Sequence, residues 1–255
     1  MTDEKISALL SLAKTDRANF PPTELYNEGW MLRLVLDWFS RHPEVEHELK
    51  FLHDAIWYSE ALLPSAFLAR KRGDKLAESW THADGVIGHF EIGKNGSGDL
   101  SLKDDARQLV VTEAKIFSKL SAGVTNARYF NQAARNVACM AEVVHRAGLS
   151  PSEFQKLGFY VVAPESRITE GNFSDHIGKE SIREVVLRRV SEYADPNQNK
   201  WFDEWFLPTL EATDVRCMPW EELLVVIEEH DPAEATELRE FYANCLKFNL
   251  PPAKR

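Results

Sequence analysis

Two residues in the segment VTEAKIF, residues 111–117, have types and a spacing that suit metal-assisted chemistry. Side chains alternate between the two faces of a strand, so Glu113 and Lys115 would lie side by side on one face. An E-x-K triplet alone is a weak signal, because a chain of this size contains about one by chance; Glu48-Leu49-Lys50 is a second copy. The triplet at 113–115 differs because it follows the apolar run QLVV, which is typical of a buried strand.

Asp84, in THADGVIGHF, is the expected partner of this triplet. The glycine-rich segment at 93–99 predicts a hairpin loop, and an antiparallel hairpin would bring Asp84 beside Glu113 and Lys115. Two carboxylates and the carbonyl of Ala114 would suit Mg²⁺ or Mn²⁺, which prefer oxygen ligands. The lysine could then orient or deprotonate a water molecule, or stabilise charge on a transition state. Two simpler interpretations stay open: Asp84-Gly85 as a tight turn, and Glu113 with Lys115 as a structural ion pair.

Hydrophobic periodicity indicates the elements that would position these residues. We expect a helix over 23–42 capped by Thr23, a strand near 55–63, a helix near 65–71, strands over 80–92 and 107–117, a helix over 126–147 ended by Gly148, and a strand over 156–165. The rest of the chain predicts further helices and one segment, from 215, that could be a strand leading into a helix. The fold class is therefore α/β, a mixed central β-sheet flanked by helices with a mostly helical C-terminal extension.

An aspartate on one strand followed by an E-x-K triplet on the next resembles the motif of the PD-(D/E)XK nuclease superfamily, whose fold is that of restriction endonucleases. Asp84, Glu113 and Lys115 match its three central positions, and Ala83 stands where the proline of the motif would be. The resemblance covers residues 23–165 as a nuclease-like core within a single domain, 1–255, and 172–255 form the extension. It implies a Mg²⁺-dependent (or Mn²⁺-dependent) nuclease that hydrolyses phosphodiester bonds, most simply in DNA.

The resemblance also implies roles for residues outside the central triplet. Gln132 matches the polar residue on the helix after E-x-K, and Glu28 matches the acidic residue of the first helix, where it would complete a metal site. Glu60 is a rival for that second role. His82 shares a strand face with Asp84 and could be a further ligand, a proton shuttle or an ordinary surface histidine.

A polar stripe is expected on the helix that begins near residue 126. Arg128, Arg135 and Asn136 are three or four residues from Gln132 in the sequence, which places them on its side of this helix, opposite the apolar positions. The stripe could face the phosphates of a substrate or only solvent. If it faces phosphates, Arg128 and Arg135 are the substrate-binding candidates.

Composition limits the class of protein. The net charge is −10, with 30 basic and 40 acidic side chains, which argues against a surface coated for nucleic-acid binding but allows a local basic groove. The apolar runs are short and the N-terminus does not resemble a signal peptide, so we expect a cytoplasmic protein that does not contact membranes. Three isolated cysteines suggest neither disulfides nor a zinc site.

Two other functions remain compatible with this sequence. The first is a non-catalytic binding or assembly protein of the same fold, in which the aromatic segment WFDEWF (201–206) contacts a partner or builds a homodimer. The second is a metal-dependent hydrolase of a small substrate. Retention of two carboxylates and a lysine at converging positions favours the nuclease.

Overall fold

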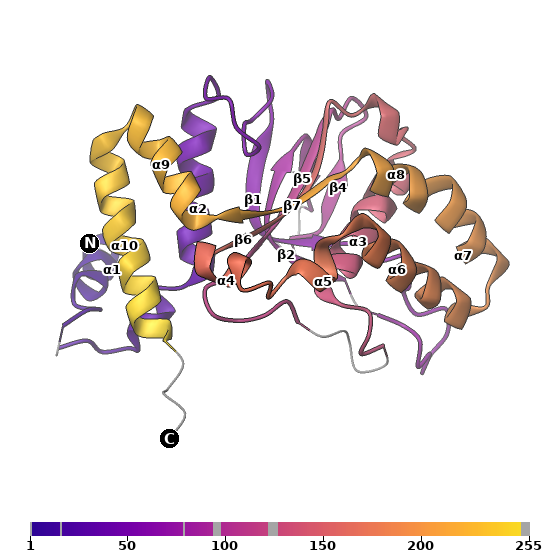
Figure 1. Cartoon of the computed structure of the whole chain (residues 1–255), viewed down its shortest axis with the longest axis horizontal. Helices are drawn as coiled ribbons and strands as arrows, with labels where there is room; N and C mark the ends of the chain where they lie inside the picture. Colours follow the sequence, from indigo (N-terminus) through magenta and orange to yellow (C-terminus); the bar gives the residue numbers. More distant parts are fainter. Residues whose placement is uncertain (1, 16, 79, 94–97, 122–126, 251–255) are drawn as a thin grey trace.

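In the part of the chain that the computed structural model describes, residues 2–250 without 16, 79, 94–97 and 122–126, a five-stranded mixed sheet forms the centre of the fold (Figure 1). Its strand order is β1-β2-β5-β6-β7, in which β1, β2 and β5 are antiparallel neighbours and β5, β6 and β7 are parallel. The strands are β1 (Ile56–Leu63), β2 (Thr81–Gly88), β5 (Gln108–Ala114), β6 (Lys156–Ala163) and β7 (Asp214–Pro219). A small two-stranded sheet, β3 (Phe90–Ile92) with β4 (Leu100–Leu102), extends from the turn between β2 and β5.

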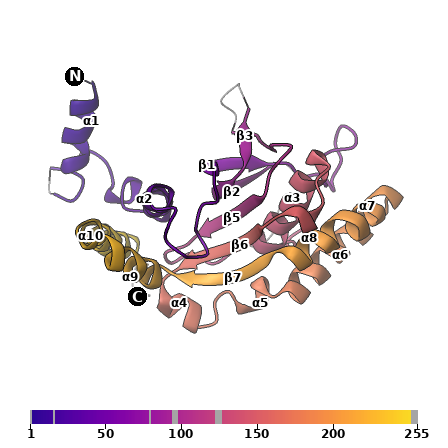
Figure 2. The same ribbon diagram turned by 90° about the horizontal axis from the view of Figure 1, so that it is seen from above.

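Helices cover both faces of the sheet and make the architecture α/β, as the sequence predicts (Figure 2). One face packs against α2, α9 and α10, and the other against α3, α6 and α8. The helices are α1 (Thr2–Ser11), α2 (Glu28–Arg41), α3 (Gln132–Ala147), α4 (Glu165–Thr169), α5 (Ser174–Ile177), α6 (Lys179–Tyr193), α7 (Pro196–Trp201), α8 (Leu207–Ala212), α9 (Trp220–His230) and α10 (Pro232–Asn249), with short turns of other helix types at Pro22–Glu24, Pro151–Glu153 and Phe202–Phe206.

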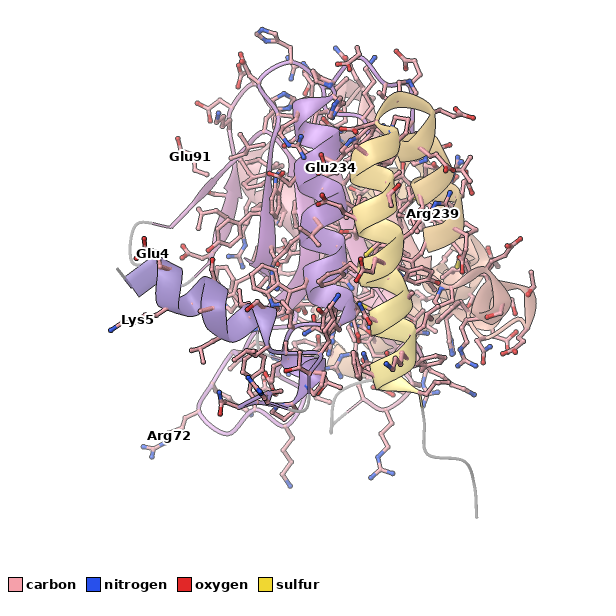
Figure 3. The ribbon with its side chains drawn as sticks, turned by 90° about the vertical axis from the view of Figure 1, so that its left-hand side faces the viewer. Glu4, Lys5, Arg72, Glu91, Glu234 and Arg239 are labelled. Atoms are coloured by element: carbon pink, nitrogen blue, oxygen red, sulfur yellow. The ribbon has the colours of Figure 1, made fainter. Side chains whose placement is uncertain are left out.

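The start of α2 differs from the prediction. Pro21 and Pro22 lead into a 3₁₀ turn, and the α-helix begins only at Glu28. Its cap is Asn27, whose side-chain oxygen accepts a hydrogen bond from the backbone N–H of Trp30 at 3.0 Å, so Thr23 is not the cap. The helix runs beside α10, as Figure 3 shows, and Arg41 of α2 forms an ion pair with Glu234 of α10 at 2.6 Å.

The predicted pairing of the Asp84 and Glu113 strands is confirmed, since β2 and β5 are antiparallel from Gly85↔Thr112 to Gly88↔Leu109. Asp84 and Gly85 lie inside β2, so they do not form a turn. The predicted loop at 93–99 falls mostly on residues 94–97, outside the described part of the chain.

Two other predicted helices also differ from the structure. The predicted strand near 55–63 is confirmed as β1, but the predicted helix near 65–71 is wrong. Pro64 precedes this segment, and the hydroxyl of Ser65 accepts a hydrogen bond from the N–H of Phe67 at 3.1 Å, which turns the chain and buries the Phe67 ring. The helix expected from 126 begins at Gln132, capped by the side chain of Asn131, and it ends at Gly148 in a left-handed conformation as predicted.

The C-terminal third is mostly helical and also supplies a strand. Strand β7 pairs with β6 in parallel from Gly158↔Asp214 to Ala163↔Pro219, so it forms one edge of the central sheet. Helices α9 and α10 then pack on the same face as α2. Among the described residues, no helix is long and apolar enough to cross a lipid bilayer.

Candidate active site

The candidate site lies where β2 and β5 separate. Their ladder ends at Gly85↔Thr112, so Asp84 and Glu113 are the next residues on the two strands. The backbone N–H of Ala114 would otherwise lack a partner there, and Asp84 accepts it through Oδ2 at 2.8 Å. The N–H and C=O of one residue point to the same side of an extended strand, so the Ala114 carbonyl faces Asp84 as well. The strand separation thus gathers two acidic side chains and one carbonyl.

Glu113 is fully buried and is held by three donors. The ammonium of Lys115 donates to Oε1 at 2.5 Å, and the side-chain amide of Gln132 donates to the same oxygen. The amide of Asn136 donates to Oε2 at 3.2 Å. Gln132 and Asn136 are one helical turn apart on α3, so the first turns of this helix clamp the carboxylate in place.

The charge state of Glu113 reflects competing effects. Burial and the neighbouring carboxylate of Asp84 raise the pKa of Glu113 to about 8, although the ammonium of Lys115 opposes the shift. At neutral pH the metal-free pair therefore retains a proton between two acids. A divalent cation would replace this proton and remove the repulsion, so the donor set of Asp84, Glu113 and the Ala114 carbonyl fits a hard cation such as Mg²⁺.

Both the side chain and the backbone of Lys115 are held by neighbouring groups. Its ammonium contacts Glu113, and its side chain is only 10 % exposed. Its N–H donates to the carbonyl of Val162 on β6 at 2.8 Å, and its own carbonyl accepts from the indole N–H of Trp220 at 2.9 Å. Trp220 is the first residue of α9, so the C-terminal third helps to hold this lysine.

A pocket of about 480 Å³ opens over these residues. Its wall combines the end of β5 with the first turns of α2 and with β1, and it is lined by Glu24, Asn27, Glu28, Gly29, Trp30, Arg33, Glu60, Asp84, Ala114 and Lys115. Four of these side chains are acidic, and among the described residues that line the pocket only Arg33 and Lys115 are basic. The pocket therefore has an acidic rim with two fixed positive charges.

Both candidates for the additional acid line this pocket. Glu28 is in the first turn of α2, and Glu60 is on β1 with a positive φ of 59°, which is unusual for a residue other than glycine and often marks a functional position. Glu60 lies 3.7 Å from the Arg33 guanidinium and 3.9 Å from His82 Nδ1. Within the described parts of the chain, no group of three or more His, Cys, Asp or Glu side chains is close enough to hold a metal ion, so neither acid joins Asp84 and Glu113 directly.

The two arginines proposed for substrate binding lie elsewhere. Arg128 is exposed in the segment before α3. Arg135 is partly buried on α3, and its charge acts on Glu78, whose pKa it helps to lower against a larger opposing effect of burial. Neither residue is among the described residues that line the pocket.

Asn136 was expected on a polar stripe that faces either the phosphates of a substrate or solvent, and in the structure it is buried. The clamp that it forms with Gln132 on Glu113 could have been recognised from the i, i+4 spacing of two amides on the helix after E-x-K. The residues of the expected polar stripe therefore have different surroundings. The two amides contact Glu113, and the charge of Arg135 acts on Glu78.

Comparison with models of protein families, with curated proteins and with solved structures found no match to this chain.

Proposed function

We propose that this protein is a Mg²⁺-dependent (or Mn²⁺-dependent) nuclease that hydrolyses phosphodiester bonds in DNA. The observation that supports this most strongly is the meeting of Asp84, Glu113 and Lys115 at the point where two sheet strands separate. A purely structural ion pair would need only one carboxylate for the lysine. A second carboxylate that raises the pKa of the first is costly to the metal-free fold, and that cost is expected at a cation site.

Each residue has a role in this proposal. Asp84, Glu113 and the carbonyl of Ala114 would hold the cation, which supplies charge neutralisation at the phosphate and a more acidic water molecule. Lys115 donates hydrogen bonds that orient the attacking water and stabilise the negative charge that develops on the phosphate. Gln132 and Asn136 keep the Glu113 carboxylate in one orientation through their amide donors.

The test is cleavage of end-labelled single-stranded and double-stranded DNA in Mg²⁺, in Mn²⁺ and with a chelator. We expect cleavage by the wild type only with a metal ion, and a loss of about 100-fold or more in Asp84→Asn, Glu113→Gln and Lys115→Met. The matched control is Lys50→Met in the second E-x-K triplet, because Lys50 pairs with the exposed Glu46 and lies outside the pocket. This variant should cleave like the wild type.

Two results would overturn the proposal. One is a wild type that cleaves no DNA with either metal and releases no heat on metal titration. The other is cleavage that survives in Asp84→Asn and Glu113→Gln, which would indicate a contaminating nuclease or a different site. The first result would favour a non-catalytic binding protein.

A further inference from the structure

Trp30 is an exposed aromatic ring at the entrance of the candidate active site. It is 42 % exposed and lines the pocket that contains Asp84 and Lys115. Of the Phe, Tyr and Trp residues that the structure describes, it alone is exposed, since the others are buried or partly buried. An exposed indole beside a phosphate-cleaving site is a surface on which a nucleobase can stack.

Arg33 keeps the indole and a positive charge together. Its guanidinium carbon is 5.0 Å from the centre of the Trp30 ring, and its Nε donates to the hydroxyl of Ser59 on β1 at 2.9 Å. Glu60 lies 3.7 Å from the same guanidinium. The arginine is thus positioned by three neighbours, and it presents its charge at the rim without needing a substrate to order it.

The charges around the pocket disfavour a grip on duplex DNA. Proteins that hold a duplex through its backbone neutralise about 6 to 10 phosphates. Here Arg33 and Lys115 are the two basic side chains among the described residues of the pocket, and Glu24, Glu28 and Glu60 would repel further phosphates. Stacking of an unpaired base on Trp30 supplies affinity that does not depend on many phosphate contacts.

We infer that the pocket binds an unpaired nucleotide of single-stranded DNA, with its base stacked on Trp30 and a neighbouring phosphate on Arg33. As a statement about substrate, this rests on the proposed nuclease function. The reacting phosphate would then lie beside Asp84 and Lys115, which line the same pocket. Duplex DNA is bound only where its strands separate.

The experiment measures binding separately from cleavage. Full-length protein carrying Asp84→Asn is titrated into a fluorescent 12-nucleotide single strand and into the matching blunt duplex, with Mg²⁺ present, and anisotropy gives Kd. Trp30→Leu keeps apolar bulk but removes the ring face, so we expect Kd for the single strand to rise roughly 5- to 150-fold, and Trp30→Phe to recover part of the loss.

Trp80→Leu is the matched control. Trp80 also has an arginine over its ring, Arg146 at 5.8 Å, but this pair lines a different pocket. Kd for Trp80→Leu should equal that of the parent. Two phosphate contacts also predict that log K falls with log salt concentration with a slope of about −1.4 for the single strand.

The inference is overturned if the blunt duplex binds as tightly as the single strand, or if Trp30→Leu weakens binding no more than Trp80→Leu. Because Trp30 is exposed, these variants should keep the parent's Tm. If Tm is lower in Trp30→Leu, Trp30→Phe, which keeps an aromatic ring, decides whether the loss of binding comes from the missing ring or from lower stability. Cleavage by the wild type is scored independently. Cleavage of duplex and single strands at equal rates, unaffected by Trp30→Leu, would retain the nuclease and refute the single-strand site.

Discussion

Adding Mg²⁺ to the metal-free protein should release a proton from the pair formed by Asp84 and Glu113. The pKa of Glu113 is raised to about 8 by burial and by the adjacent carboxylate. Most of the group is then protonated at pH 7, so each Mg²⁺ bound should displace up to about one proton there and clearly fewer at pH 9. The apparent association constant should fall about tenfold for each pH unit below 8.

Isothermal titration calorimetry measures this proton release directly. Titrations at pH 7 in PIPES and in Tris, whose ionisation enthalpies differ, give the number of protons from the difference in observed heat. Glu48→Gln, in the second E-x-K triplet, is the control and should leave the number unchanged. Equal observed enthalpies in the two buffers, or the same affinity at pH 6 and pH 8, would refute the argument that metal and proton compete for Glu113.

Three further predictions concern residues around the site. Metal-free wild type should lose stability between pH 5 and pH 8, because the pKa of Glu113 is higher in the folded chain than in the unfolded chain, and Glu113→Gln should flatten this slope in urea unfolding. Gly85→Ala should lower the free energy of unfolding by about 1–3 kcal/mol, because a Cβ there would lie 2.6 Å from Thr112 Oγ1 in a closely packed part of the sheet. Trp220→Phe should reduce DNA cleavage and cost about 1 kcal/mol of stability, because it removes the hydrogen bond to the Lys115 carbonyl.

For each of these three predictions, one outcome would contradict the reasoning. A stability that rises from pH 5 to pH 8 in the wild type, relative to Glu113→Gln, would place the pKa of Glu113 below its unfolded value. An unchanged urea midpoint for Gly85→Ala would mean that the Thr112 side chain can move away from the added methyl group without cost. Full cleavage by Trp220→Phe would show that β6 alone holds Lys115 in place.

The strands of this fold can be predicted from the sequence more accurately than the ends of its helices. Short apolar runs bounded by glycine or charge predict β1, β2, β5 and β6, since burial on both sheet faces selects such runs. The start of α2 was misplaced because Thr23 and Asn27 are both good capping residues, and only the turn that follows Pro21 and Pro22 selects the second. Local propensity cannot choose between two acceptable caps.

The same difference applies to the candidate site. Asp84, Glu113 and Lys115 could be paired from the sequence, because their approach depends only on the register of two neighbouring strands. The i, i+4 spacing places Asn136 on the same face of α3 as Gln132. Whether that face is buried against Glu113 could not be predicted, because it depends on how α3 is rotated against the sheet. The surroundings of Arg135 could not be predicted either, because they include Glu78, a residue far away in the chain. Helix rotation is decided by tertiary packing, which a periodic pattern does not report.

The contribution of the C-terminal third follows from similar reasoning. Sequence patterns predict its helices, but they do not tell where those helices dock. In the structure, Trp220 is buried against the end of β5 and donates to the Lys115 carbonyl, and β7 immediately before it extends the sheet beside β6. The lysine therefore depends on a residue 105 positions further along the chain. A chain shortened before β7 would leave that carbonyl without its donor and β6 as an open edge, so the site requires the C-terminal third to reach its observed geometry.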